Sequence, residues 1–183
     1  MIRKYTHEEI QTSKPTPKQV RSFKRMPVSV VLNDIRSLYN VGAIFRTSDG
    51  ILAEKLFLCG ITGHPPRKEI DKVALGAVET VPWSYSPSAK ETLLKLKEKG
   101  VKIVALELAD GSEHFKAFEY PFPMALVLGN EVEGVSDELM PFVDYCVSIP
   151  MLGRANSLNV ATAYGITAYE ILHQYNEKNV NKN

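Results

Sequence analysis

Between two apolar segments, the chain reads Ile149-Pro150-Met151-Leu152-Gly153-Arg154-Ala155-Asn156-Ser157-Leu158-Asn159-Val160. The segment before it, Tyr145–Ile149, is predicted to be a strand. Pro150 and Gly153 favour a tight loop that leaves main-chain groups uncovered. Such a loop can hold an adenine through backbone hydrogen bonds, while Ile149, Met151 and Leu158 supply apolar walls.

The end of this loop is predicted to begin a long helix, from Ser157 to about Tyr175. Ser157 is a candidate N-cap, and capping alone would account for it. Asn159 is expected in the first turn, where its intrinsic propensity is unfavourable. The partial positive charge of a helix N-terminus would favour a carboxylate or a phosphate at this place.

A second segment follows the predicted buried strand Met124–Leu128 and reads Gly129-Asn130-Glu131-Val132-Glu133-Gly134. Gly129 and Gly134 permit a sharp turn and let the backbone approach a ligand. Glu131 is either an ordinary loop carboxylate paired with a nearby arginine or a site residue that orients Arg46 or the neighbouring loops. A nucleotide-phosphate site is a rival interpretation, but no Gly-Lys-Ser/Thr and no Gly-x-Gly-x-x-Gly pattern occurs.

A third segment, nearer the N-terminus, reads Asn40-Val41-Gly42-Ala43-Ile44-Phe45-Arg46-Thr47. It opens a predicted helix over Val41–Leu52, whose apolar residues recur at helical spacing. The spacing alone does not place Arg36, Asn40 and Arg46 on one helical face. Arg46 is a catalytic candidate, and binding of a phosphate is the plainer alternative.

Together, in this order and with these separations, the three segments resemble the motifs of the TrmH (SpoU) branch of the SPOUT RNA methyltransferases. The resemblance runs from about Val28 to Tyr175. It implies S-adenosylmethionine-dependent 2′-O-ribose methylation of tRNA or rRNA, a homodimer, and a C-terminal trefoil knot. By the same resemblance the cofactor contacts are Leu128, Gly129, Ile149, Met151, Gly153, Ser157 and Leu158, and the catalytic or supporting residues are Asn40, Arg46, Glu131, Ser157 and Asn159.

Resemblance also gives Arg46 the role of a general base toward the ribose hydroxyl. Physical chemistry opposes that role, because a guanidinium is effectively always protonated in proteins. We therefore favour positioning and electrostatic stabilisation of the developing alkoxide, and keep the base role as the alternative. A sulfonium methyl donor is already activated, so alignment of the reacting atoms supplies much of the rate enhancement and no metal is expected.

Charge is distributed unevenly along the chain. Residues 1–26 contain seven basic and two acidic side chains, a net charge of +5, whereas the whole chain carries +1, so the remainder carries −4. A basic arm is expected to grip RNA phosphates. The alternatives are a solvated leader and an arm that packs Tyr5, Ile10 and Val20 on the domain. The expected RNA contacts are Arg21, Lys24, Arg25, Arg36, Arg46 and Arg154, of which Arg36 and Arg154 could equally form surface salt bridges.

Strands alternate with helices along the chain, which predicts an α/β domain with a mostly parallel sheet and helices on both faces. We expect a basic arm over 1–26, a methyltransferase domain over 27–175 and a polar tail over 176–183. Apolar runs are too short to cross a bilayer, and no secretory signal is apparent, so a cytoplasmic protein without membrane contact is expected. The two cysteines lie in apolar runs and indicate reduced, buried thiols.

Three other functions remain open at this point. One is an RNA-binding module that kept the fold without catalysis, although the presence of Arg46, Glu131 and Asn159 speaks against it. Another is a base methyltransferase of a different SPOUT branch, which the Asn40–Thr47 segment disfavours because its role is tied to ribose. The last is a nucleotide-binding enzyme of unrelated chemistry. The RNA and the nucleotide are not specified by the sequence.

Overall fold

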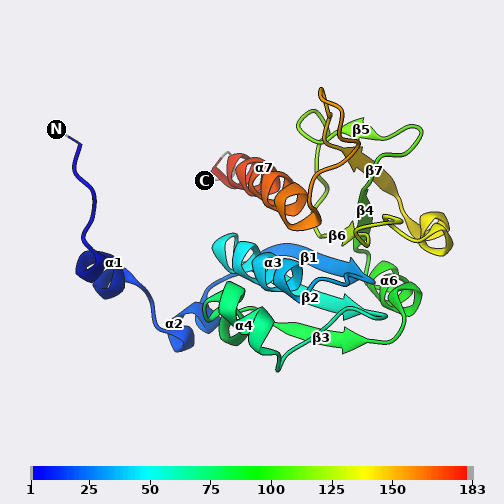
Figure 1. Ribbon diagram of the computed structural model, residues 1–183. Coiled ribbons are helices and arrows are strands. Elements are labelled where there is room, and N and C mark those ends of the chain that lie inside the picture. Colours follow the sequence, from blue (N-terminus) through cyan, green and yellow to red (C-terminus); the bar gives the residue numbers. More distant parts are fainter. Residues whose placement is uncertain (1, 181–183) are drawn as a thin grey trace.

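A computed structural model describes residues 2–180 of the chain (Figure 1). Seven parallel strands form one sheet in the order β3-β2-β1-β6-β4-β7-β5. The strands are β1 (Met26–Asn33), β2 (Ala53–Cys59), β3 (Trp83–Ser86), β4 (Lys102–Leu106), β5 (Glu113–His114), β6 (Met124–Leu128) and β7 (Tyr145–Ser148). The helices are α1 (His7–Ser13), α2 (Pro17–Ser22), α3 (Leu38–Gly50), α4 (Lys68–Ala74), α5 (Ala77–Thr80), α6 (Ala89–Glu98), the 3₁₀ helix η1 (Asp137–Phe142) and α7 (Val160–Val180).

Helices cover both faces of the sheet, and this confirms the predicted fold class. On β1, Val30 and Leu32 point to one face, where they pack with α3, α4 and α7. Val31 points to the other face, where it packs with α6 and η1. A strand that is buried on both faces reads as a continuous apolar run, which is the pattern of β6, whereas β1 is apolar from Met26 to Leu32 except for the buried Ser29. The trefoil knot stays a prediction.

Both helices that carry site residues begin elsewhere than predicted. Helix α3 begins at Leu38, three residues early, because Ser37 Oγ accepts a hydrogen bond from the Asn40 backbone N–H. Helix α7 begins at Val160, so the prediction that Ser157 caps it is wrong. The cap is Asn159, whose Oδ1 accepts from the N–H groups of Ala161 and Thr162 at 3.0 and 3.3 Å.

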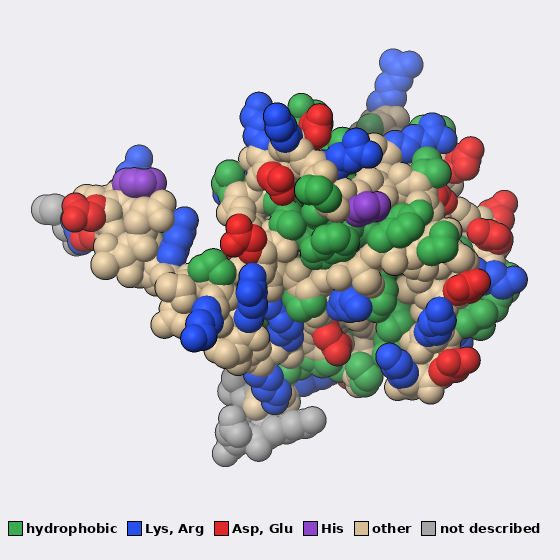
Figure 2. All heavy atoms as spheres, turned by 90° about the horizontal axis from the view of Figure 1, so that it is seen from below, with side chains coloured by type: hydrophobic (Ala, Val, Ile, Leu, Met, Phe, Trp, Pro, Cys, Tyr) green, Lys and Arg blue, Asp and Glu red, His purple; other side chains and the backbone are tan. Residues whose placement is uncertain are grey.

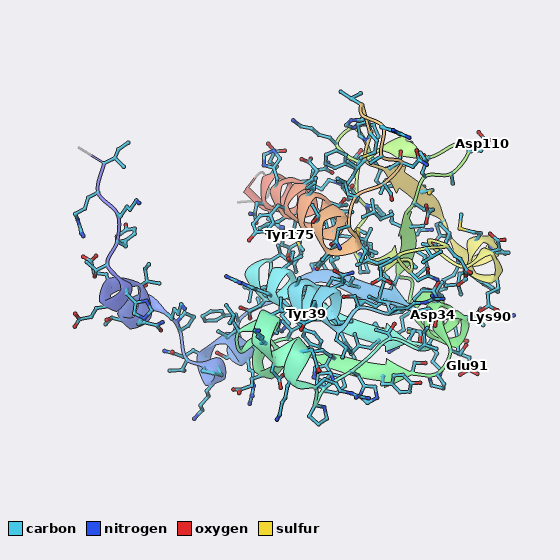
Figure 3. All side chains as sticks on the ribbon, viewed as in Figure 1. Asp34, Tyr39, Lys90, Glu91, Asp110 and Tyr175 are labelled. Atoms are coloured by element: carbon cyan, nitrogen blue, oxygen red, sulfur yellow. The ribbon has the colours of Figure 1, made fainter. Side chains whose placement is uncertain are left out.

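Helix α7 also continues past the predicted end. Tyr175, labelled in Figure 3, lies inside the helix, which runs to Val180. Lys178 Nζ holds this last turn by donating to the Tyr120 carbonyl at 3.0 Å and pairing with Glu119 at 2.9 Å. Residues 176–180 of the predicted polar tail are therefore helical, and 181–183 lie outside the described residues.

The N-terminal arm has two parts. Its prolines interrupt it as predicted, so α1 and α2 are separate short helices. Helix α1 buries no residue and stands apart from the body of the molecule (Figure 2). The α2 part is docked, because Val20 is buried and Arg21 Nε donates to the Glu79 carbonyl at 2.9 Å. Arg25 completes the attachment by donating to the carbonyls of Ala53 and Thr80.

Candidate functional site

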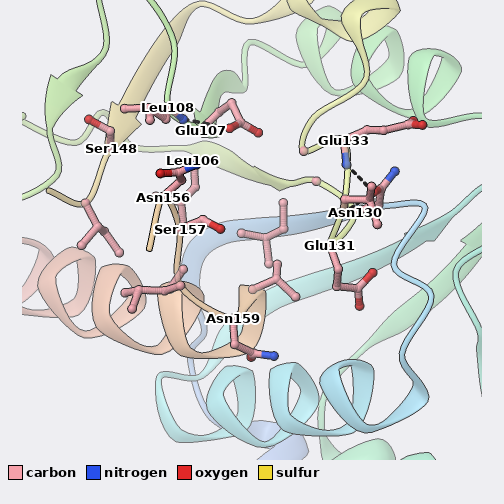
Figure 4. A pocket seen from close by; sticks show the side chains of 18 residues that line it. Leu106, Glu107, Leu108, Asn130, Glu131, Glu133, Ser148, Asn156, Ser157 and Asn159 are labelled. Atoms are coloured by element: carbon pink, nitrogen blue, oxygen red, sulfur yellow. Dashed lines mark hydrogen bonds between the residues drawn. The ribbon is translucent and has the colours of Figure 1, made fainter. Parts of the chain in front are cut away.

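A pocket of about 470 Å³ lies over the carboxyl ends of β4, β6 and β7 (Figure 4). Ligands of open parallel sheets bind at this edge, as expected from the order of strands and motifs. The lining is contributed by three loops and the start of α7, and comprises Leu106–Leu108, Leu128–Gly134, Ser148–Ile149, Asn156–Val160 and Ala163.

Most of the predicted cofactor residues line this pocket: Leu128, Gly129, Ile149, Ser157 and Leu158. Met151 and Gly153 do not, so these two predictions are not supported by the geometry. The loop tip turns away from the pocket, because Leu152 is fully exposed and a Cβ on Gly153 would meet nothing within 4 Å.

The Gly129 loop is tightly closed against itself. A Cβ on Gly129 would collide with the backbone of Gly134 and Val135, so only glycine fits. Asn130 and Gly134 exchange two backbone hydrogen bonds of 2.9 and 3.0 Å. Asn130 Oδ1 also accepts from the N–H groups of Val132 and Glu133, each at 2.8 Å. The loop therefore presents bare backbone to the pocket in a fixed shape.

Glu131 fastens this loop to the entrance of α3. Its carboxylate accepts from the backbone N–H groups of Arg36 and Ser37 at 3.1 and 3.2 Å. It also accepts from Asn40 Nδ2 at 2.8 Å. These bonds agree with the expectation that Glu131 orients the neighbouring loops. Within residues 2–180 Glu131 forms no ion pair with an arginine, so the alternative of an ordinary carboxylate paired with a nearby arginine does not apply.

Asn40 extends the connection to α7. Its Oδ1 accepts from Asn159 Nδ2 at 3.0 Å, while its Nδ2 donates to Glu131. Asn159 in turn caps α7. We call the three residues Glu131, Asn40 and Asn159 the polar relay. It joins the three motif segments into one hydrogen-bonded unit, although Asn40 and Asn159 are 119 residues apart in the chain.

The electrostatics of the relay follow from its donors. Partial burial raises the pKa of the Glu131 carboxyl, but hydrogen bonds from the Asn40 amide and from the backbone of Arg36 and Ser37 outweigh burial. The pKa of Glu131 therefore lies below its usual range. The carboxylate is charged at neutral pH and fixes the amide orientation of Asn40, because only Nδ2 can donate to it.

Arg46 lies on α3, six residues after Asn40 of the relay. Its side chain is exposed, and among residues 2–180 it makes no hydrogen bond or ion pair. The helix around it is rigidly held, because Phe45 is buried on one side and Ser48 exchanges a buried hydrogen bond of 2.8 Å with Tyr164 of α7. A guanidinium on this support is available to an external ligand.

Glu107 was not among the predicted site residues, yet it lines the pocket. Its carboxylate accepts from the N–H groups of Leu108 and Val135, each at 2.9 Å. It thereby braces the far side of the Gly129 loop. Its position directly after β4, at the carboxyl edge of the sheet, is the signal that would have found it.

The predicted RNA contacts divide by their surroundings. Lys24, Arg36 and Arg154 have exposed side chains that form no ion pair within the described chain, which removes the surface salt-bridge alternative for Arg36 and Arg154. Arg21 and Arg25 instead bond main-chain carbonyls of the domain. For these two residues the competing interpretation, an arm packed on the domain, agrees with the contacts. Tyr5 and Ile10 remain exposed.

Two further observations concern chemistry and environment. Within residues 2–180, no three His, Cys, Asp or Glu side chains gather in a way that could hold a metal ion. Of the helices described, none has the length and apolar character required to cross a membrane.

A parallel α/β sheet with a pocket over its carboxyl edge and a polar relay at the rim is the arrangement in which open α/β proteins bind their ligands. Comparison with known families narrows the class. The model of the SpoU rRNA methylase family matches residues 27–169, and the chain belongs to this family.

Individual relatives agree with this assignment. A tRNA (guanosine(18)-2′-O)-methyltransferase of Aquifex aeolicus is 32% identical and is matched over 88% of this chain and 76% of its own length. A 23S rRNA (guanosine-2′-O-)-methyltransferase of Neisseria meningitidis is also 32% identical, over 87% of this chain. This chain spans 64% of that relative and 64% of a putative TrmH family methyltransferase of Bacillus subtilis, just under two thirds of their length.

Solved structures share the fold. The A. aeolicus TrmH/SpoU tRNA-modifying enzyme superposes with a TM-score of 0.80 over 89% of this chain and 84% of its own. The SpoU methyltransferase AviRb of Streptomyces viridochromogenes, in complex with the cofactor AdoMet, superposes with a TM-score of 0.78 at 26% identity, over 87% of this chain and 64% of its own.

Proposed function

We propose that this protein is an S-adenosylmethionine-dependent 2′-O-ribose methyltransferase of tRNA or rRNA. The observation that carries the proposal is the polar relay, which draws the three motif segments together at the rim of one pocket. Arg46 lies six residues beyond Asn40 on the same helix, and its guanidinium forms no hydrogen bond or ion pair within residues 2–180. A donor pocket and an acceptor-facing arginine are the two parts that methyl transfer to an RNA hydroxyl needs.

The pocket residues fit S-adenosylmethionine. Leu106, Ile149 and Leu158 provide apolar walls for an adenine, and the Gly129 loop offers uncovered main chain beside them. Carboxylates of Glu107 and Glu131 supply negative charge that suits a ligand bearing a sulfonium and an ammonium group. When bound, this cofactor supplies a methyl group that is already activated for transfer.

The residues of the chain then have separable tasks. Glu131 and Asn40 fix the start of α3 relative to the pocket, which sets where Arg46 stands. Arg46 keeps its proton, so we assign it the stabilisation of the ribose oxygen as that oxygen loses its own proton. Transfer is then favoured by alignment of the two substrates rather than by a strong base.

Two readouts on Arg46 variants test this assignment. Loss of one preorganised electrostatic partner lowers a rate by about 10²–10³, so Arg46→Ala should lose methyl transfer to bulk tRNA and rRNA by that factor. Its affinity for S-adenosylmethionine, measured by calorimetry, should stay within a few-fold. Arg46→Lys should also be slow, because an ammonium does not reproduce the planar guanidinium. Near-normal turnover of Arg46→Ala would remove Arg46 from the mechanism.

The RNA class stays at tRNA or rRNA, since relatives of equal identity act on each. The non-catalytic and base-methylating alternatives have no observation of their own in the structure. Mapping of ribose and base methylation in total RNA, from cells with and without the protein, identifies the nucleotide. From this substrate class we also propose a cytoplasmic location.

The arm contributes to RNA affinity through its outer part. Because residues 17–25 pack on the domain, we assign this contribution to the exposed basic residues that precede them, which are Lys4, Lys14 and Arg3, the last of these paired with Glu9. Deletion of residues 1–16 should weaken RNA binding and flatten the slope of log affinity against log salt by roughly 0.7–0.9 per lost phosphate contact. An unchanged slope in a folded truncation would exclude the arm.

We assign a homodimer to the exposed face of α7. Ala168 of this helix is buried in the core of its own chain and is unavailable for a contact with a second copy. Ile166 and Tyr169 are 40% and 54% exposed on the same helix and are apolar enough to bury against a second copy. Light scattering at micromolar concentration should give the mass of a dimer for the wild type and of a monomer for Tyr169→Asp.

A further inference from the structure

A cluster of aromatic side chains lies at the free edge of the sheet, outside the pocket. His64 is exposed, and its ring centroid is 4.8 Å from that of Tyr85 and 6.3 Å from that of Trp83. The His64 and Trp83 rings are nearly parallel, with an interplanar angle of 22°. Tyr85 is 46% exposed. We call these three residues the aromatic platform.

The platform is held in place by polar contacts. Tyr85 Oη donates to the Gly60 carbonyl at 3.1 Å, and His64 Nδ1 lies 2.9 Å from the Pro65 carbonyl. Trp83 is half-buried and meets Phe45 of α3 edge to face, with ring centroids 6.4 Å apart. The rings are therefore preorganised, and contact with a ligand would cost little conformational entropy.

The platform is tied to the proposed active centre. The backbone N–H of Ile61 donates to Asp34 Oδ1 at 2.8 Å, where Asp34 follows β1 (labelled in Figure 3). Thr62 Oγ1 accepts from the Ile35 N–H at 3.0 Å. Arg36 and Ser37 follow Ile35 in the chain, and their backbone N–H groups donate to the Glu131 carboxylate. The loop after β2 is thus hydrogen-bonded to the loop after β1, and that loop is hydrogen-bonded to the polar relay.

Helix α4 strengthens this link. Its Ile70 carbonyl lies so close to Gly42 of α3 that a Cβ there would be 2.6 Å away. Gly42 belongs to the turn between Asn40 and Arg46. The platform and the loop that leads into α4 therefore sit beside the segment that presents Arg46.

Charge around the platform favours an anionic ligand. Arg67, at the end of the loop that follows His64, and Lys68, the first residue of α4, are exposed and form no ion pair within the described chain. Lys72 adds a third positive charge, while Glu69 and Asp71 contribute two negative charges. Figure 2, which looks at the molecule from the β3 side, shows hydrophobic side chains around a histidine, with both basic and acidic side chains at their border. Strand β3 itself is the last of the sheet, so within residues 2–180 no strand covers its outer edge.

We propose that the aromatic platform stacks unpaired bases of the RNA substrate that flank the methylated nucleotide, while Arg67 and Lys68 bind the adjoining phosphates. Exposed rings beside basic side chains are the combination that binds single-stranded nucleic acid without sequence preference. The proposal rests on the proposed function for its substrate, and it adds a binding surface outside the pocket.

Trp83 is the only tryptophan of the chain, so its fluorescence reports on the platform alone. Titration of the full-length protein with a mixed-sequence 12-nucleotide single-stranded RNA should quench it saturably. The fully paired duplex of the same strand should quench it far less, because its bases are stacked inside the helix.

Variants test the rings themselves. Stacking contributes about 1–3 kcal/mol per base, so His64→Ala and Tyr85→Leu should each weaken binding of the 12-mer roughly five- to 150-fold. Tyr85→Phe and His64→Phe retain a ring and should bind like the wild type. Tyr145→Leu, which removes a tyrosine that is 41% exposed on β7, is the matched control and should also bind normally.

The outcomes separate this proposal from the proposed function. Affinity for S-adenosylmethionine should be unchanged in all five variants, which also shows that they are folded. Arg46→Ala should lose methyl transfer and keep the quenching. If the wild type methylates RNA but its fluorescence is not quenched, or if His64→Ala and Tyr85→Leu bind RNA normally, the aromatic platform is wrong and the proposed function stands. If His64→Ala instead converts a dimer into a monomer by light scattering, the surface is a subunit interface and the proposal is wrong. If the protein neither binds S-adenosylmethionine nor transfers a methyl group, but RNA still quenches its fluorescence, the proposed function is wrong and the aromatic platform stands.

Discussion

Replacement of Asn159 by alanine tests the polar relay and the helix cap together. The change removes an acceptor for two backbone N–H groups of α7 and a donor to Asn40. Loss of an N-cap costs about 1 kcal/mol, and loss of a neutral hydrogen bond about 0.5–1.5 kcal/mol. Because Asn159 is exposed, water replaces part of both, and we expect a total of roughly 1–2 kcal/mol. At about 2–4 °C per kcal/mol for a chain of this size, Tm should fall by roughly 2–8 °C.

Asn159→Asp separates the two functions of the side chain. The aspartate keeps an acceptor for Ala161 and Thr162 and places a negative charge at the N-terminus of α7, so Tm should stay near that of the wild type. It has no donor for Asn40, whose Oδ1 cannot turn away while Nδ2 is held by Glu131. Methyl transfer should therefore fall although stability is kept. Calorimetric melting and a radiolabelled methyl-transfer assay give both quantities. An alanine variant with unchanged Tm, or an aspartate variant with full activity, would refute the reasoning.

Other predictions concern the pocket loop, pH and a buried thiol. Gly129→Ala should destabilise the protein and abolish S-adenosylmethionine binding by calorimetry, because the new methyl group meets backbone that cannot yield; Gly165→Ala, which meets nothing within 4 Å, should be neutral or stabilising. Because the pKa of Glu131 is lowered in the folded protein, its ionised carboxylate stabilises the fold at pH values above the unfolded-state pKa, and this stabilisation is lost as the pH falls through the folded-state pKa. The Tm difference between the wild type and Glu131→Gln should therefore be present at pH 7 and close below about pH 4; a constant difference would contradict this. Burial raises the pKa of Cys59 to about 11, so peptide mass mapping after treatment with a thiol reagent at pH 8 should find Cys59 unmodified until the protein is unfolded; rapid native labelling would show the assignment to be wrong.

Much of the fold could be predicted because its signals are local. Largely apolar runs such as Val28–Leu32 and Met124–Leu128 indicate buried strands, and both are central in the sheet. The sequence also indicated a sharp turn at Gly129, and in the structure no other residue fits at that position. Motif order then predicted which strand ends meet, and the pocket lies there.

The remaining errors arise from contacts between distant segments. Nothing local distinguishes Asn159 from Ser157 as the cap, and the choice depends on the partner that Asn40 offers. For Glu131 the sequence left open a pairing with a nearby arginine or an orienting role, whereas in the structure its carboxylate accepts from backbone N–H groups and an amide. The end of α7 depends on the bond of Lys178 to the Tyr120 carbonyl, 58 residues away. Local propensity contains none of these partners.

The proposed function is tested most directly by the chemical position of the transferred methyl group. Purified protein is incubated with isotopically labelled S-adenosylmethionine and total tRNA or rRNA from cells that lack it, and the RNA is digested to nucleosides for mass spectrometry. We predict label in a 2′-O-methylated nucleoside from a single site, and no label with Arg46→Ala. Label on a base, or none despite measurable cofactor binding, would contradict a ribose methyltransferase.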